Sequence, residues 1–461
     1  MNYHALLSQS GRVVRAALIG AGEFGRSLLS QSQAIDNLDI CVLCDQNLHT
    51  ARDACRRAGI PVDTIAVCDS AASARKNLAE GLRVLVEDSA LVMDLPVDIV
   101  VEATGNPEAG AGNAAAALAN GKHVAMATKE ADSVVGPLLH RRALQAGLIY
   151  TPVDGDQPSL LLGLLSWART LGLEVVAAGK SSEYDFVYDP ASSVVSWRDR
   201  SIEVPGFASL WRLSPGDHAA TIAARADALA ALPQRTVPDL CEMGLVVNAS
   251  ELRPDVPNFH VPVARTVEVP DILCPQAAGG ILEQTGVIDI FNCLRRPDEA
   301  SFAGGVFIIV ACRDATTWRT LRDKGIPISG DPGYALLYNP QHLLGVEAPV
   351  SILSAVLLNQ STGSTDIDHR CDLVARAARD FAAGETLTIT DHHHHEVAGL
   401  EPLLLGPAKA IGSNPLPYYM AVERPLTRAV AAGSVIACDM VVHDDASVLW
   451  SLRAEQDNQK G

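Results

Sequence analysis

Basic residues are scarce in this sequence, and long apolar runs are absent. The 461 residues include 36 Lys and Arg against 54 Asp and Glu, which gives a formal net charge of −18 at pH 7. Nucleic acid and anionic membrane surfaces would be repelled by this charge, which argues against either as a partner. No stretch approaches a transmembrane span, and residues 1–15 contain no apolar core of signal-peptide length. We therefore expect a cytoplasmic protein.

The ten cysteines contain one C-x-x-C spacing, from Cys41 to Cys44, and it falls inside a predicted apolar strand. Several, such as Cys41 and Cys44, lie inside apolar runs, which is typical of small buried hydrophobic residues in a reducing cytosol. The hydrophobic content of 48% and the charged content of 20% are ordinary for a globular protein. A chain of this length is expected to fold into two or three domains with sizeable cores.

A glycine-rich turn follows the apolar run 13–19 and precedes a predicted helix at 26–34. The turn has the form G-x-G-x-x-G and consists of Gly20, Ala21, Gly22, Glu23, Phe24 and Gly25. Such glycines allow a tight turn and bring backbone N–H groups close to a pyrophosphate, at the positive end of a helix dipole. The turn therefore predicts a dinucleotide site, and a tight strand–helix turn without a ligand is the alternative.

Asp45 ends the second predicted strand, 20 residues after Gly25. A carboxylate that binds the adenosine ribose is expected about 20 residues after the turn. The same carboxylate would repel a 2′-phosphate, and the next residues, Gln46 and Asn47, supply no cation. The sequence therefore favours NAD(H) over NADP(H).

Strand-like and helix-like segments alternate from residue 13 to residue 152. This alternation predicts an α/β domain with a doubly wound parallel sheet. Because such sheets bind ligands outside the carboxyl ends of their strands, three loops should meet at the reactive end of the cofactor. The loops are 104–107, with Thr104, Gly105 and Asn106, then 128–132, and finally 154–158.

The pattern changes after residue 160. A strongly apolar strand at 304–311 predicts an α+β second domain built on an open sheet. A polar cluster at 362–370 indicates a further boundary. The tail from 372 to 449 is predicted to be a small β-rich module. Its four consecutive histidines at 392–395 cannot all face one metal ion, so we interpret them as a solvated loop.

Lys129 follows the apolar strand predicted at 123–127, so it should project from the sheet edge towards the nicotinamide. An amine there can donate a hydrogen bond to an alcohol or carbonyl oxygen, and it could shuttle a proton if desolvation lowered its pKa. An exposed lysine that caps the next helix is the alternative. The neighbouring Glu130 and Asp132 fit a helix N-terminus as well as a catalytic role.

Further candidates are Asp154, Asp156, Lys180 and Glu242. The two aspartates flank a glycine, and such a pair can bind a divalent metal, hold a polyol or act as acid and base. Asp156 also precedes Pro158, as a helix N-cap would. Lys180 ends a predicted strand and could bind a substrate carboxylate or phosphate, or be a solvated lysine. A metal such as Mg²⁺ or Mn²⁺, if the reaction needs one, would use Asp154, Asp156 and Glu242.

Two known families share motifs with this chain. The segment 124–131, which contains Lys129, is similar to the Thr-Ala-Asn-Lys segment of homoserine dehydrogenases. Over nearly its whole length the chain more closely resembles the 1-deoxyxylulose 5-phosphate reductoisomerase-like (DRL) oxidoreductases. That resemblance includes the glycine turn and segments 102–107, 155–159, 178–180, 275–282, 286–289, 305–307, 333–334 and 342–343. In the tail, 377–386 and 425–436 resemble the pattern of SAF domains.

The DRL resemblance implies three parts: a Rossmann domain at 1–153 plus about 331–358, a catalytic domain at 154–330, and a SAF domain at 370–455. It also implies that Lys129, Asp156, Lys180 and Glu242 surround the substrate, with the nicotinamide beside Thr104 and Gly105. The chain departs from its relatives in two respects. DRL enzymes use NADPH and have basic residues where this chain has 45–47, and they lack a lysine at position 129. Homoserine dehydrogenases have no SAF domain.

The expected function is an NAD(P)-dependent dehydrogenase or reductoisomerase for a small polar hydroxy or keto compound, with or without a phosphate or carboxylate. The alternatives are homoserine dehydrogenase itself and a non-enzymatic protein that senses the dinucleotide. The strand at 306–310 resembles those through which homoserine-dehydrogenase-like subunits pair, and long apolar strands need cover on both faces. We therefore expect a homodimer or homotetramer.

Overall fold

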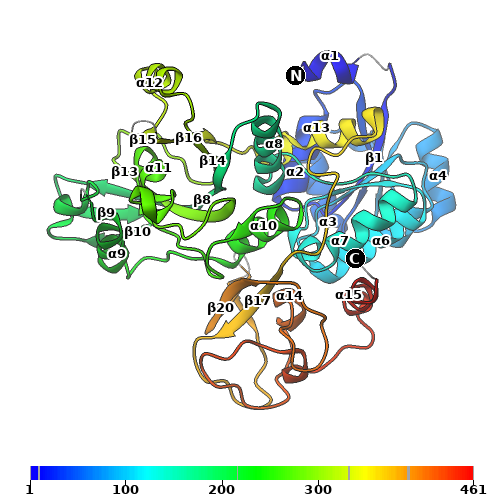
Figure 1. Cartoon of the computed structure of the whole chain (residues 1–461). Helices are drawn as coiled ribbons and strands as arrows, with labels where there is room; N and C mark the ends of the chain where they lie inside the picture. Colours follow the sequence, from blue (N-terminus) through cyan, green and yellow to red (C-terminus); the bar gives the residue numbers. More distant parts are fainter. Residues whose placement is uncertain (1, 9–10, 215, 331–332, 392–394, 460–461) are drawn as a thin grey trace.

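The computed structural model describes residues 2–8, 11–214, 216–330, 333–391 and 395–459. Its N-terminal part, drawn in blue and cyan in Figure 1, contains a parallel sheet. The order of its strands is β3-β4-β2-β1-β5-β6-β7. The strands are β1 (Val14–Ile19), β2 (Leu38–Cys44), β3 (Ile65–Val67), β4 (Arg83–Val86), β5 (Ile99–Glu102), β6 (His123–Met126) and β7 (Tyr150–Pro152). The doubly wound sheet predicted from the alternating pattern is confirmed.

Helices cover both faces of this sheet, as the apolar central strands require. Its helices are α1 (Tyr3–Ser8), α2 (Glu23–Ser32), α3 (Leu48–Arg57), α4 (Ala71–Ala79), α5 (Ser89–Met93), α6 (Pro107–Ala119) and α7 (Lys129–Gln145). Leucines and alanines of α2 and α3 pack on one face, and those of α6 and α7 pack on the other. The two faces therefore form separate hydrophobic clusters, and the strand ends stay free for loops.

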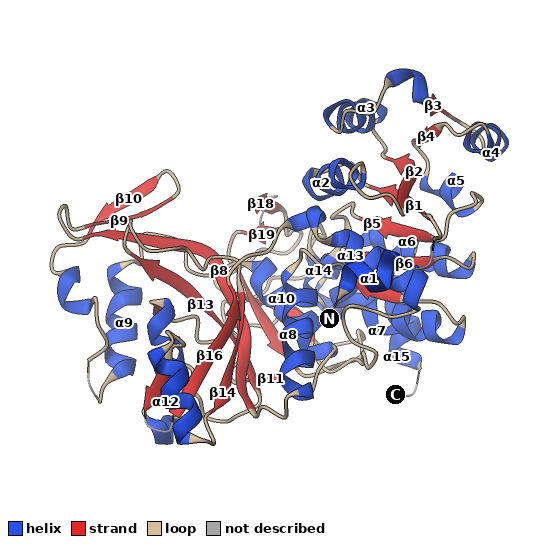
Figure 2. Ribbon diagram, turned by 90° about the horizontal axis from the view of Figure 1, so that it is seen from above, coloured by secondary structure: helices blue, strands red, loops and turns tan. Residues whose placement is uncertain are grey.

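The second part is a mixed sheet of nine strands with β8 and β14 at its centre (Figure 2). The strands are β8 (Val175–Asp189), β9 (Val194–Trp197), β10 (Arg200–Glu203), β11 (Arg253–Pro254), β12 (Val263–Ala264), β13 (Val287–Arg295), β14 (Val306–Ala311), β15 (Ile328–Gly330) and β16 (Gly333–Asn339). The helices are α8 (Gln157–Thr170), α9 (His218–Ala228), α10 (Val237–Asn248), α11 (Val269–Ile272) and α12 (Ala315–Asp323).

Strand β14 is covered on both faces within one chain. Ile308 packs with Ala178 and Ile288 on one face, while Phe307 packs with Phe291 on the other. Every residue from 306 to 310 is fully buried. The apolar strand thus needs no second subunit for its cover, and the homodimer or homotetramer stays a prediction.

A third, β-rich part follows residue 371 and consists of short strands. It contains β17 (Asp372–Ala377) paired with β20 (Leu400–Leu405), β18 (Ile389–Asp391) paired with β19 (Glu396–Val397), and α14 (Tyr418–Ala421). The chain then returns as α15 (Val448–Asn458), which lies beside α6 and α7 (Figures 1 and 2). The SAF assignment and the domain limits stay predictions, and histidines 392–394 lie outside the described residues.

Between the second and third parts, the chain passes back over the first. The turn Leu344–Val346 packs on α2, and it is followed by α13 (Ala348–Leu353) and a π-helical turn, Ser354–Leu358. A Cβ atom at Gly345 would lie 2.6 Å from the backbone nitrogen of Leu28 and even closer to the carbonyl oxygen of Phe24. Only glycine allows this close approach. In the described part of the chain, no helix has both the length and the apolar character needed to cross a membrane.

We predict that Gly345→Ala destabilises the protein by about 1–3 kcal/mol, because the added methyl group would press on backbone atoms of α2 that cannot move aside. The matched control is Gly163→Ala on the exposed side of α8, where a Cβ meets nothing within 4 Å. There the change should stabilise by up to about 1 kcal/mol. Thermal unfolding followed by circular dichroism measures both. Equal melting temperatures for the two variants would contradict the tight packing of this turn on α2.

Candidate dinucleotide cavity and active site

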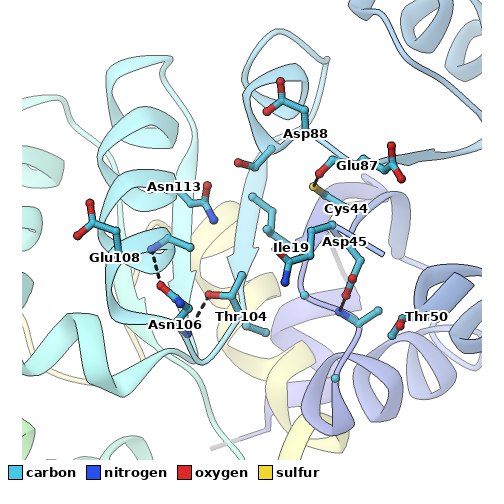
Figure 3. A pocket seen from close by; sticks show the side chains of 17 residues that line it. Ile19, Cys44, Asp45, Thr50, Glu87, Asp88, Thr104, Asn106, Glu108 and Asn113 are labelled. Atoms are coloured by element: carbon cyan, nitrogen blue, oxygen red, sulfur yellow. Dashed lines mark hydrogen bonds between the residues drawn. The ribbon is translucent and has the colours of Figure 1, made fainter. Parts of the chain in front are cut away.

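A cavity of about 640 Å³ lies at the carboxyl ends of β1, β2, β4 and β5 (Figure 3). The order of the strands reverses between β1 and β5, and parallel sheets bind their ligands at such a point. The residues around it are Ile19, Gly20, Ala21, Gly22, Cys44, Asp45, Gln46, Thr50, Glu87, Asp88, Ser89, Ala103, Thr104, Asn106, Glu108, Ala109 and Asn113. Its position and size suit the adenosine and pyrophosphate of a dinucleotide.

The glycines of the turn have different physical roles. Gly20 has φ +100°, and a Cβ there would lie 2.9 Å from the backbone nitrogen of Thr104. Gly22 has open space around it, so a ligand can approach its backbone. Helix α2 begins directly after Gly22, which has no side chain to cap the first N–H groups. These donors and the helix dipole would therefore fit a pyrophosphate. Glu23 and Phe24 belong to the first turn of α2 and do not line the cavity.

Asp45 lies in the cavity wall and holds the turn in place. Its two carboxylate oxygens accept hydrogen bonds from the backbone N–H groups of Ala21 (2.9 Å) and Asn47 (2.8 Å). Glu87, Asp88 and Glu108 also line the cavity, and of its described lining residues none is lysine or arginine. The wall is therefore negatively charged around the place expected for the ribose.

The loop after β5 connects the cavity to the start of α7. Asn106 caps α6 by accepting a hydrogen bond from the N–H of Ala109 (2.9 Å), and Thr104 accepts one from the N–H of Asn106 (3.2 Å). The N–H of Gly105 donates to the hydroxyl of Thr128 (3.0 Å). Because Thr128 immediately precedes Lys129, the cofactor loop and the candidate lysine are held together.

Five charged side chains, from α7, β8, α10 and the residue before α8, meet next to this loop. Glu242 of α10 accepts hydrogen bonds from Lys129 on one carboxylate oxygen and from Lys180 of β8 on the other. Lys180 also lies 2.7 Å from a carboxylate oxygen of Asp239, and Lys129 lies 3.9 Å from one of Asp156. The predicted residues Lys129, Asp156, Lys180 and Glu242 are thus brought together.

Electrostatics fixes the charge state of this cluster. Burial disfavours the ionised form of Glu242, but Lys129 and Lys180 outweigh it and lower the pKa of that carboxyl to about 2. Burial likewise disfavours the charged form of Lys129, but Asp156 and Glu242 outweigh it and raise the pKa of the amine well above its usual value. Burial raises the pKa of Asp156, although Lys129 opposes it. The Lys129 amine is therefore protonated, whereas the sequence left open a pKa lowered by desolvation.

Asp156 caps α8 and also faces Lys129, so the predicted cap is present and the catalytic role stays a prediction. Its side chain accepts a hydrogen bond from the N–H of Gln157 (3.0 Å) and so caps α8, while the same carboxylate oxygen faces Lys129. Asp154, in contrast, accepts a hydrogen bond from the hydroxyl of Ser159 (2.5 Å) and belongs to a separate hydroxyl network. Burial raises the pKa of Asp154 to about 6.

The three carboxylates expected to bind a metal are not assembled around one point. Glu242 is bound by two ammonium groups, and Asp154 interacts with Ser159 instead. Among the described residues, no group of three His, Cys, Asp or Glu side chains is placed to hold a metal ion. The metal requirement therefore stays an untested prediction.

Sequence reasoning missed Asp239 and His342. Asp239 stands one helical turn before Glu242 on α10, so the i, i+3 spacing could have identified it. It is buried, and it accepts a hydrogen bond from the hydroxyl of Ser182 (2.6 Å). His342 comes from the loop before the turn on α2, and its ring packs against Gly304. Burial, followed by the charge of Lys180, lowers the pKa of His342. No local pattern marked that histidine.

Two segments of the chain match known protein families. Residues 20–151 match the NAD-binding domain of homoserine dehydrogenase, and residues 155–348 match the catalytic domain of oxidoreductase DRL. Both matched models describe domains of oxidoreductases. The first match contains the glycine turn and Lys129, and the second contains Asp156, Lys180 and Glu242. No curated protein matches the sequence.

Solved structures resemble parts of the fold at low identity. The WlbA dehydrogenase from Bordetella pertussis, in complex with NADH and UDP-GlcNAcA, is 15% identical over 39% of this chain and 49% of that chain, with TM-score 0.27. The NADPH complex of 1-deoxy-D-xylulose 5-phosphate reductoisomerase from Zymomonas mobilis is 20% identical over 45% and 51%, with TM-score 0.29. A protein from Thermotoga maritima described as a probable dehydrogenase is 13% identical over 76% and 91%, with TM-score 0.37. The chain spans about half the length of the first two proteins.

We predict that Glu242→Gln destabilises the protein by about 3–5 kcal/mol, because the buried ammonium group of Lys180 and the partly buried one of Lys129 lose the carboxylate that they share. The control is Glu401→Gln, which removes an exposed pair with Arg376 and should change stability by less than about 1 kcal/mol. Urea unfolding at pH 7 measures both. A Glu242→Gln variant as stable as the control would show that the cluster is not held by this carboxylate.

Proposed function

We propose that the protein catalyses hydride transfer between NAD(H) and a small polar hydroxy or keto compound, with Lys129 bound to the reacting oxygen. The observation that carries this proposal is the position of Lys129. Lys129 is the first residue of α7 and directly follows Thr128, whose hydroxyl accepts a hydrogen bond from the cofactor loop. The ammonium group of Lys129 donates to Glu242 and faces Asp156. A charged donor is thus fixed beside the place expected for the nicotinamide.

The cluster supplies what the reaction needs apart from the hydride. A bound nicotinamide would give the hydride to a carbonyl carbon, or accept it from the corresponding alcohol. In reduction, Lys129 donates a proton to the oxygen as negative charge develops there. In oxidation, the alcohol proton passes to the neutral form of Lys129, and because the pKa of that amine is raised well above its usual value, the site favours the reductive direction near neutral pH. Proton and hydride therefore balance in both directions.

Lys180 takes a different role from the one expected of it. It is 3% exposed and already interacts with both Asp239 and Glu242. We propose that it holds Glu242 in place for Lys129 rather than binding a phosphate or carboxylate of the substrate. Because three carboxylates share two ammonium groups here, the cluster favours substrates that present hydroxyl and carbonyl groups.

The acidic cavity wall supports NAD(H) over NADP(H) as the cofactor. A 2′-phosphate near Asp45 would meet the negative charge of that residue and of Glu87 and Asp88. Asp45 also fixes the turn through Ala21, so its removal should affect both the ribose and the pyrophosphate.

Asp45→Ala should weaken NADH binding by about 1.5–3 kcal/mol, since hydrogen bonds to a charged group are lost. Titration of NADH and NADPH against nucleotide fluorescence measures the dissociation constants. The control Asp53→Ala removes an aspartate of α3 that pairs with Arg57 on the surface and should leave them unchanged. NADPH binding that equals or exceeds NADH binding in the unmutated protein would refute the preference for NAD(H).

Lys129→Ala should lower kcat about 10²-fold or more with NADH binding intact, because the lost hydrogen bond is strongest when charge develops on the oxygen. The assay is a panel of hydroxy acids, polyols, L-homoserine and sugar phosphates, followed by NADH absorbance. The control is Lys324→Ala, at the residue after α12, and this variant should keep the kcat of the unmutated protein. If Lys129→Ala kept near-normal turnover, Asp156 would become the candidate for the acid–base role instead. Running the panel with and without a chelator separates a plain dehydrogenase from a metal-dependent reductoisomerase.

A further inference from the structure

The C-terminal helix α15 is bound to the first turn of α6, next to the cofactor cavity. Glu108 stands two residues after Asn106 and lines the cavity, on the side away from Asp45 (Figure 3). Its carboxylate accepts hydrogen bonds from the hydroxyl of Ser447 and from the N–H groups of Val448 and Leu449. A carboxylate at a helix N-terminus satisfies free N–H groups and interacts favourably with the helix dipole. The start of α15 is therefore stabilised by a residue of the cavity wall.

The same helix is bound to α7 where that helix contains Pro137. A proline inside a helix supplies no N–H group and disturbs the turn before it. The N–H of Leu138 donates to the side-chain oxygen of Gln456 (3.0 Å), and the side-chain nitrogen of Gln456 donates to the carbonyl of Val134 (3.1 Å). In an undisturbed helix this N–H and this carbonyl would pair with each other. Gln456, which is 3% exposed, therefore bridges the two ends of the disturbed turn.

Arg453 fixes the remaining side of α15 to the β-rich part. It is fully buried, and its guanidinium donates to both carboxylate oxygens of Asp372 (2.7 and 2.9 Å) and to the carbonyl of Ala408 (2.6 Å). The position of α15 is thus set by the β-rich part, while its contacts reach α6 and α7. Those two helices begin at the cofactor loop and at Lys129 respectively.

We propose that docking of α15 and binding of the dinucleotide stabilise each other, with Glu108, Ser447 and Gln456 as the positioning residues that connect them. The helix holds the first turn of α6 and the disturbed turn of α7 in the arrangement that places the cofactor loop beside Lys129. A ligand that binds this arrangement better than a looser one must also favour the docked helix, because such coupling is reciprocal. The proposal rests on the proposed function only in taking the cavity as the dinucleotide site.

Hydrogen exchange on the unmutated protein gives the first test. NADH should slow amide exchange in residues 448–458, which do not line the cavity, in addition to any effect in the glycine turn. Slowing in the turn without any change in 448–458 would overturn the coupling and leave the cofactor site intact. Exchange that NADH changes nowhere, together with no measurable binding, would instead refute the proposed function.

The reciprocal test uses a double variant, Ser447→Ala with Gln456→Met, which leaves the cavity wall unchanged. It should bind NADH about fivefold or more weakly by fluorescence titration. The matched control is Arg142→Met, which removes a contact between α7 and α15 at Glu455, far along α7 from Lys129. It should bind NADH as the unmutated protein does. Unchanged affinity in the double variant, or equal weakening in the control, would overturn the proposal.

Discussion

Glu242 is the side chain on which the site depends, because it joins parts of the molecule that are distant in sequence. Lys129 comes from the parallel sheet and Lys180 from the mixed sheet, and each donates to one oxygen of this single carboxylate. The buried Lys180 could not stay charged without a carboxylate partner, and the same carboxylate stabilises the charge of the partly exposed Lys129. The shared acid therefore fixes the charge state of the cluster and the way in which the two sheets face each other.

Helix α10 supplies carboxylates that contact both lysines. Asp239 and Glu242 lie three residues apart on its buried side, so both carboxylates face Lys180 while Glu242 alone extends to Lys129. The two lysines therefore differ in how many of their N–H groups already have an acceptor. Lys180 has two close acidic partners, whereas Lys129 has one close partner and a more distant one in Asp156. Lys129 is accordingly the amine with donor capacity left for a substrate oxygen.

Local patterns predicted the first sheet and its cofactor loop, because a glycine turn, apolar strands and an acid at a fixed spacing act over short stretches of sequence. Lys129 and Asp156 were identified because each follows a predicted strand, and the carboxyl ends of parallel strands meet at one edge of a sheet. The pairing of Lys180 with Asp239 was not predictable, since it depends on how α10 packs against β8. The separation of Asp154 from Asp156 had no signal either, because neighbouring carboxylates look alike until Ser159 is placed beside one of them.

Pro137 makes helix α7 depend on contacts with α15, which returns to the first sheet. A proline in the middle of α7 costs roughly 3 kcal/mol where nothing compensates for it. In this structure the compensation comes from Gln456, more than 300 residues later in the sequence. A helix that carries the candidate acid at its first residue thus owes part of its stability to α15. No sequence pattern at Pro137 reveals this dependence, because the amide that completes the turn belongs to another part of the fold.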